Sequence, residues 1–131
     1  MVKNRPICLY TKNMTDIKLE TDRLLLKPMH ESDAEVVVHW RNLRHISKFG
    51  LSRAQNPISL NDHISWFRNT RNSRIDYIIF LKAGMQRIGS LSYVFRELNG
   101  KNCAEIGKYI GETSMLGKGY ATEATDCWLK F

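Results

Sequence analysis

The chain has 131 residues, which is the size of a single domain. With 43% hydrophobic and 25% charged residues, and no apolar run longer than Tyr77–Leu81, the composition excludes both a mainly disordered chain and a membrane-spanning helix. The 20 Lys and Arg residues outnumber the 13 Asp and Glu residues, and the net charge of +7 favours an anionic partner: a phosphorylated cofactor, a nucleotide-linked substrate, an acidic protein or a nucleic acid. The basic residues are scattered rather than grouped, so a nucleic acid is the least favoured of these partners.

The first third of the chain predicts a strand followed by a helix. Residues 1–19 are expected to be a loosely held lead-in, and residues 23–28 have the apolar character of a strand that ends at a proline. Ser32 and Glu35 have the spacing of a capping box, and the apolar residues that follow predict a helix from residue 33 to about 44.

The middle of the chain predicts an irregular stretch and then a second helix. Residues 45–57 contain the breakers Gly50 and Pro57 and are expected to be irregular. Ser59 is a second N-cap signal, and the apolar residues behind it share one helical face, which predicts a helix from residue 60 to about 70.

The second half of the chain changes to a strand period and then returns to a helix. Strands are predicted over residues 76–81, 87–95 and 103–110. A Gly-rich segment then leads to a helix that begins near residue 119, whose apolar stripe reaches Phe131. A strand–loop–helix unit normally packs beside a following parallel strand, and none follows here. We therefore expect the 131 residues to be the N-terminal portion of a longer domain, or to be completed by a partner chain such as a second copy in a homodimer.

The segment with Gly117 and Gly119 carries the clearest chemical signal. Glycines let the backbone approach a ligand closely, and the N-terminus of the following helix favours a phosphate. The competing interpretation is a Gly-rich turn without a ligand. Two other phosphate motifs do not fit: a P-loop would need a hydroxyl residue at Gly119, and a dinucleotide-binding loop would need a glycine at Thr122.

Two stretches of the chain resemble the acetyl-CoA motif of the GNAT N-acetyltransferases, residues 106–111 (IGKYIG) and residues 117–124 (GKGYATEA). The opening at residues 20–28 (ETDRLLLKP), followed by Ser32-Asp33-Ala34, resembles the branch that contains the ribosomal-protein N-terminal acetyltransferases. The resemblance implies an α+β GNAT fold with a mixed central sheet over residues 20–131, with the C-terminal strands absent from this chain.

The resemblance also implies acetyl-CoA as the cosubstrate and no metal. The pyrophosphate would be held by the backbone amides of Leu116, Gly117, Lys118, Gly119, Tyr120 and Ala121. The pantetheine arm would pair, like an added strand, with the backbone of Tyr109, Ile110 and Gly111, where strands of this family splay. Ser114 departs from the family pattern, which has Gln or Arg there, but backbone atoms do most of the binding.

The chemistry of amine acetylation requires a base that takes a proton from the ammonium and an acid for the leaving thiolate. The family often uses a carboxylate near the central strand as the base, and Glu105 is the only carboxylate inside a predicted central strand. The competing interpretation is an outward-facing Glu105, since a half-solvated strand alternates polar and apolar residues. The Tyr that often acts as the acid in the family would lie beyond Phe131.

Trp40, Arg41 and Asn42, together with His63 in the segment 58–67, resemble acetyltransferases that act on nucleotide-linked amino sugars. Such side chains suit stacking on a base and hydrogen bonding to a sugar, and His63 could serve as a base or bind a hydroxylated substrate. The competing interpretation is that Trp40 belongs to the core and that His63 packs between helices.

Together these features predict an enzyme that moves an acetyl group from acetyl-CoA to a primary amine by direct attack, with a nucleotide-linked amino sugar as the preferred acceptor. A protein or peptide N-terminus is the second candidate acceptor, and a CoA-binding or RNA-binding domain without turnover is the third interpretation. Three cysteines without paired spacing fit reduced thiols and a cytoplasmic location, and no Cys or His spacing is typical of a zinc site.

Overall fold

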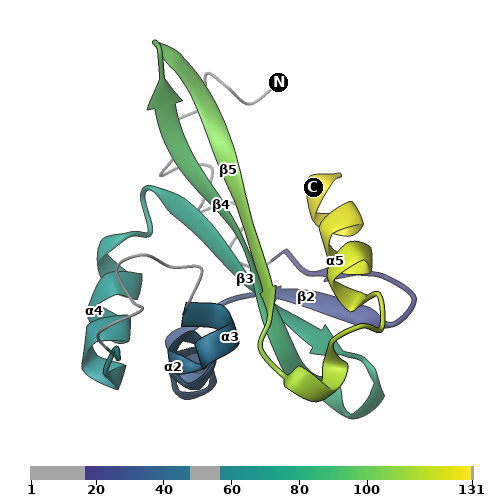
Figure 1. Ribbon diagram of the computed structural model, residues 1–131. Coiled ribbons are helices and arrows are strands. Elements are labelled where there is room, and N and C mark those ends of the chain that lie inside the picture. The colour runs from purple at the N-terminus through teal and green to yellow at the C-terminus, as the bar shows by residue number, and fades with distance from the viewer. Residues whose placement is uncertain (1–16, 48–56, 131) are drawn as a thin grey trace.

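The computed structural model describes residues 17–47 and 57–130. The predictions for most of the lead-in, for Gly50 and for Phe131 therefore lie outside the described residues. The described strands form one sheet in chain order (Figure 1): β1 (Leu19–Glu20), β2 (Leu24–Pro28), β3 (Arg74–Leu81), β4 (Gln86–Leu98) and β5 (Lys101–Ile110).

The predicted α+β fold class is confirmed, and the described part of its sheet is antiparallel throughout, whereas the resemblance implied a mixed sheet. Each described strand pairs with the next one along the chain, and every one of these pairings is antiparallel. A parallel pairing needs a crossover that brings the chain back to the end of the sheet where the previous strand began, and no described strand follows the last helix. The strand predictions themselves are confirmed, although β3, β4 and β5 each extend beyond the predicted bounds.

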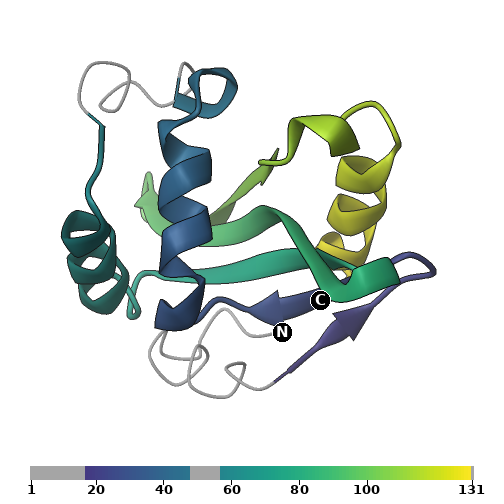
Figure 2. The same cartoon turned by 90° about the horizontal axis from the view of Figure 1, so that it is seen from below.

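Within residues 17–47 and 57–130, four α-helices cover the two faces of the sheet: α2 (Ala34–Asn42), α3 (Arg44–Ser47), α4 (Leu60–Asn69) and α5 (Tyr120–Leu129). Figure 2 shows α2, α3 and α4 on one side of the strands and α5 on the other. In Figure 1 the β4–β5 hairpin extends well beyond the helices, and its tip is exposed.

The core is divided by β3, whose residues 75–80 are all buried. Ile75, Tyr77 and Ile79 pack in the cluster that contains Trp128 of α5. Ile78 and Phe80, on the opposite face, pack with Val37 and Trp40 of α2. A strand that is buried on both faces has a nearly continuous run of apolar residues instead of alternating apolar and polar residues. This run is why the sequence predicted a strand in this segment.

The helix starts show one wrong prediction and one confirmed prediction. The predicted capping box of Ser32 and Glu35 does not form, because a 3-10 turn at Glu31–Asp33 precedes α2. The buried Asp33 carboxylate instead accepts from the His30 N–H at 2.8 Å and pairs with Arg87 of β4 at 2.7 Å, and this long-range partner is invisible to local spacing.

The start of α4 agrees with the sequence. Ser59 is its N-cap, and the Ser59 hydroxyl accepts from the Asp62 N–H at 3.0 Å. The short helix α3 lies at the beginning of the segment that was expected to be irregular, which is a further correction. α5 begins at Tyr120, one residue after the predicted start.

Candidate functional site

The Gly-rich loop reaches α5 through two residues with left-handed backbone. Gly117 has φ of 74° and Gly119, the N-cap of α5, has φ of 82°. Residues 116–119 are exposed. The Glu123 N–H donates to the Gly119 carbonyl at 3.0 Å, which is the first hydrogen bond of the helix. The backbone N–H groups that precede Glu123 in the first turn have no carbonyl of the helix to donate to, so a cap or a ligand can accept from them. The local geometry therefore suits an anion at the start of α5.

Arg23, at the entry to β2, holds this loop from the side. Its Nε atom donates to a Glu123 carboxylate oxygen at 2.7 Å, and its Nη1 atom donates to the Lys118 carbonyl at 3.1 Å. The guanidinium also lies 4.4 Å from the centre of the Tyr120 ring. The chain segment before β2 thus fixes both the loop and the first turn of α5.

Glu123 is a carboxylate in the first turn of the helix that begins at the predicted anion site. The Thr21 hydroxyl donates to it at 2.5 Å, in addition to the two donors of Arg23. Burial alone would raise the pKa of the Glu123 carboxyl, but the hydrogen bonds from Thr21 and Arg23 and the charge of Arg23 outweigh it and hold the pKa below its ordinary value. The negative charge next to the loop is therefore compensated within the fold.

The end of β5 is held by residues of α2 and α3. The Gly111 N–H donates to the Ile88 carbonyl at 2.7 Å, and a Cβ atom on Gly111 would lie 2.2 Å from the Trp40 ring. The Trp40 Nε1–H donates to the Glu112 carboxylate at 2.7 Å. The His45 Nε2 atom lies 3.3 Å from the Ile110 carbonyl oxygen, a hydrogen bond that requires the proton on Nε2.

A cavity of about 240 Å³ lies between the sheet and the pair of helices α2 and α4. Polar and charged side chains supply much of its wall. The lining consists of Met29, Val37, Arg41, Trp66, Arg74, Asp76, Ser90, Leu91, Ser92, Gly107, Lys108 and Tyr109. Tyr109 connects this cavity to the predicted cofactor segment, because it belongs to both.

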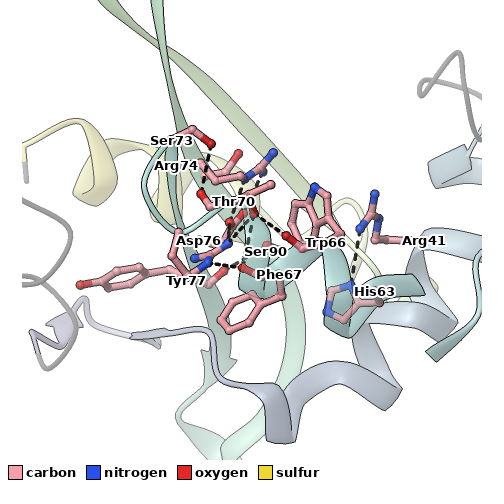
Figure 3. Close-up of polar contacts among 12 residues, drawn as sticks. Arg41, His63, Trp66, Phe67, Thr70, Ser73, Arg74, Asp76, Tyr77 and Ser90 are labelled. Carbon is pink, nitrogen blue, oxygen red and sulfur yellow. Dashed lines mark hydrogen bonds and ion pairs between the residues drawn. The ribbon is translucent and has the colours of Figure 1, made fainter. Parts of the chain in front are cut away.

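The floor of the cavity contains a buried carboxylate that is held by two guanidiniums. Asp76 is 5% exposed, and its two oxygens accept from Arg71 and Arg74 at 2.8 Å each (Figure 3). A buried carboxylate is stable only when it is paired and hydrogen-bonded, and this one is both.

Trp66 of α4 stands between two cationic side chains in Figure 3. The Arg41 guanidinium lies 4.7 Å from the centre of the Trp66 ring, and the Arg74 guanidinium lies 4.8 Å from it. The Arg41 Nη1 atom is 3.4 Å from the Nδ1 atom of the buried His63. Two of the predicted acceptor residues, Arg41 and His63, are therefore neighbours.

Tyr109 contributes a phenol to the same cavity wall. Burial raises the pKa of the Tyr109 hydroxyl far above its ordinary value, and the nearby Asp76 carboxylate adds to this, while Arg41 and Ser90 oppose it. The phenol therefore stays protonated and can donate a hydrogen bond. Its ring meets the Trp40 ring edge to face, with the ring centres 6.0 Å apart.

The remaining predicted acceptor residues have contacts within the fold. Trp40 is fully buried, so its placement agrees with the core interpretation. Asn42 bonds both the N–H and the carbonyl of Ile58 at 2.9 Å, which ties α2 to the segment before α4.

Glu105, the predicted base, lies toward the tip of the β4–β5 hairpin and outside the cavity lining. Its carboxylate pairs with Arg96 at 2.8 Å and its side chain is 62% exposed. By strand alternation it shares the sheet face of Tyr109, but four residues of extended strand, roughly 13 Å, separate the two. This placement agrees with the outward-facing interpretation.

Sequence reasoning missed Arg23, His45, Arg74 and Asp76. The sequence did contain a signal for Arg74 and Asp76: residues two apart at the start of a strand lie on the same face, so their opposite charges are neighbours. No local signal exists for Arg23, whose partner is 100 positions away.

Two further observations concern only residues 17–47 and 57–130. No group of three or more His, Cys, Asp or Glu side chains there could hold a metal ion. None of the helices in this part of the chain has the length and apolar character that a bilayer crossing requires.

Comparison with known proteins adds three findings. The family described as "Acetyltransferase (GNAT) domain" matches residues 23–131. The uncharacterized protein MJ1062 of Methanocaldococcus jannaschii is 29% identical over 114 residues, which are 86% of this chain and 22% of that protein. The chain thus spans less than a quarter of the length of this curated relative.

Two solved structures have a similar fold. AAC(6')-Ib, in complex with ribostamycin and coenzyme A, superposes with a TM-score of 0.68 and 22% identity, over 83% of this chain and 66% of that chain. FdhC, described as a nucleotide-linked sugar GNAT, superposes with a TM-score of 0.67 and 20% identity, over 88% of this chain and 65% of that one.

Proposed function

The chain belongs to the GNAT acetyltransferase domain family, and from this premise we propose that it transfers an acetyl group from acetyl-CoA to a primary amine. One observation carries the proposal: the exposed loop at Gly117 and Gly119, with left-handed glycines, opens directly into α5 at the end of an antiparallel sheet. The family's acetyl-CoA motif lies at this loop in the sequence. Backbone amides at the start of a helix can donate hydrogen bonds to the oxygens of a diphosphate.

We assign the cofactor contacts to the backbone. The amides of residues 116–121 hold the pyrophosphate, and the backbone of residues 109–111 pairs with the pantetheine arm. Two features support this assignment: Arg23 orients the loop, and the close approach of Trp40 to Gly111 fixes the path of the chain as it leaves β5.

The reaction forms a bond between the amine nitrogen and the acetyl carbonyl carbon and breaks the bond from that carbon to sulfur. The attacking amine must be neutral, so the ammonium first loses one proton, and the departing sulfur gains one to give the free thiol. The products are an N-acetyl amine and coenzyme A. The protonated Tyr109 hydroxyl can donate a hydrogen bond at the wall of the cavity, next to the predicted pantetheine segment.

For the acceptor we propose a nucleotide-linked amino sugar, bound against α2 and α4 with Arg41 and His63 among the contacting residues. The fold shared with FdhC is compatible with this choice, as the fold shared with AAC(6')-Ib is with an aminoglycoside. A protein or peptide N-terminus is the competing acceptor.

The experiment has two steps. Isothermal titration with acetyl-CoA tests the loop, and release of free thiol with a panel of sugar, aminoglycoside and peptide amines tests turnover. We expect micromolar acetyl-CoA binding and thiol release with at least one amino-sugar nucleotide. Binding without thiol release from any amine would indicate a CoA-binding domain without turnover, and the absence of acetyl-CoA binding would contradict the proposal as a whole.

A further inference from the structure

The peptide that joins Ile110 to Gly111 lies at the end of β5, within the segment that we expect to pair with the pantetheine arm. We propose that His45 of α3 is a positioning residue for acetyl-CoA: it holds the Ile110 carbonyl, so that the arm pairs with the Ile110 N–H and not with the carbonyl beside it. The inference rests on the proposed function, because it concerns how the same cofactor segment sets the register of the arm.

The Ile110 carbonyl points away from β4. The described chain has no cis peptide bond, and in a trans peptide the carbonyl and the N–H point in opposite directions. The Gly111 N–H donates to the Ile88 carbonyl of β4 at 2.7 Å, so the Ile110 carbonyl of the same peptide faces the outer edge of β5. In the part of the chain that the structure describes, β5 is the last strand of the sheet. Its outer edge is therefore where a ligand that pairs like a strand can bind.

The Ile110 N–H faces the same outer edge. The Tyr109 carbonyl lies so close to β4 that a Cβ atom on Gly89 would be 2.2 Å from its oxygen, and the Ile110 N–H is the other end of that peptide. Ile110 thus presents one donor and one acceptor at the edge. A ligand amide can pair with either group, and the choice sets its register along the strand.

His45 removes one of these choices. A carbonyl can only accept, so the Nε2 atom of His45, which lies 3.3 Å from the Ile110 oxygen, carries the proton of this hydrogen bond. The imidazole ring then occupies the place in front of the carbonyl where a ligand N–H would otherwise lie. The Ile110 N–H is left as the group of this residue that a carbonyl of the arm can approach.

The same stretch of backbone is fixed on its other sides. A Cβ atom on Gly111 would lie 2.2 Å from the Trp40 ring, so the indole packs directly against the backbone there. The Trp40 Nε1–H donates to the Glu112 carboxylate at 2.7 Å, and the Glu112 N–H donates to the Ile88 carbonyl at 3.3 Å. The peptide is therefore ordered before the arm arrives, which lowers the entropy cost of binding.

The test compares a ligand that has the arm with one that lacks it. Coenzyme A and 3'-phospho-ADP, which is coenzyme A without its pantetheine arm, are titrated by calorimetry into the 131-residue protein. His45→Leu removes the ring N–H, and we expect it to weaken coenzyme A binding about fivefold, as for the loss of one hydrogen bond. The dissociation constant of 3'-phospho-ADP should change less than twofold, because the loop before α5 binds that part of the cofactor.

Two further variants separate positioning from stability. His45→Gln keeps an N–H donor and should restore most of the affinity for coenzyme A. His39→Leu makes the same change at an exposed histidine of α2, and it should leave both dissociation constants within about twofold of wild type. If His45 only stabilised the fold, His45→Leu would weaken both ligands alike.

A measurement without ligand tests the hydrogen bond itself. Nitrogen NMR of the neutral His45 ring should find the proton on Nε2, the atom that faces the Ile110 carbonyl. A proton on Nδ1 would overturn the inference. So would equal losses for the two ligands in His45→Leu, unchanged coenzyme A binding in that variant, or no rescue by His45→Gln. These four results leave acetyl-CoA binding by the wild type intact, whereas a wild type that does not bind acetyl-CoA would overturn the proposed function as well.

Discussion

The negative charge of Glu123 lies next to the loop that we expect to bind an anion. A carboxylate in the first turn of α5 interacts well with the helix dipole but repels an incoming diphosphate. Thr21 and Arg23 compensate for this by donating hydrogen bonds to its oxygens, and Arg23 also supplies a charge. Arg23 and Glu123 therefore form an ion pair without net charge, which holds the loop in place and does not repel a diphosphate.

We expect Glu123→Gln to reduce the stability of the protein at pH 7 and to flatten its acid dependence. Because the pKa of Glu123 is lowered in the folded protein, its contribution is present above the ordinary carboxyl value of 4.5 and is lost as the pH falls through the lowered pKa. Urea unfolding from pH 7 to 3 measures the effect. Glu97→Gln, on the exposed hairpin, is the control and should match the wild-type slope.

Glu105→Gln should leave kcat within about twofold of wild type and the free energy of unfolding within about 0.5 kcal/mol, because its exposed ion pair with Arg96 is weak. Steady-state thiol release at saturating amine, measured from pH 6 to 9, tests this. A large loss of turnover that is greatest at low pH would instead identify Glu105 as the base.

At the scale of elements, the junction between the loop and α5 is the unit that we expect to bind acetyl-CoA. Gly119→Asp should lower the affinity at least about tenfold with the fold retained, because a like charge beside the diphosphate costs on the order of 1.4 kcal/mol or more. Gly119→Asn has nearly the same shape and tolerance of left-handed backbone but no charge, and it should lose much less. Calorimetry compares the affinities, and circular dichroism checks the fold. Equal losses in the two variants would point to backbone distortion rather than to a diphosphate site.

The sequence anticipated elements better than it anticipated contacts. The strands, α4 with its Ser59 cap and the start of α5 follow from periodicity and capping, which are local signals. The capping box at Ser32 was wrong because Asp33 finds its partner on β4. Arg74 and Asp76, two residues apart on one face of β3, did carry a local signal, but the contact of Arg74 with Trp66 could not be foreseen because folding brings Trp66 to it from another element.

At the scale of the molecule, the sheet separates the two regions that we propose for the cofactor and for the acceptor. α5 and the Gly-rich loop before it lie on one side of the sheet, and α2 and α4 lie on the other (Figure 2). Residues of α2 and α4 also line the cavity described above. Tyr109 and Gly111 lie where the two meet, at the end of β5.

This division predicts which backbone amides acetyl-CoA should protect from hydrogen exchange. Hydrogen exchange should slow most over residues 109–123 when acetyl-CoA is present, because those amides would bind the ligand or be held by it. Residues 98–101, at the hairpin tip, should exchange at the same rate with and without it. Protection spread evenly over the chain would contradict a local binding site and indicate a general tightening of the fold.

The bond between Arg23 and Glu123 also leads us to expect an order of events during folding. It closes a loop of 100 residues, and such long closures come late because their entropy cost is met only after nearer contacts exist. A ribosome-bound chain would therefore complete its central hairpin well before the glycine bend acquires its final shape. A protein shortened to begin after Pro28 would keep every residue of that bend, yet it would lack the side chain that orients it.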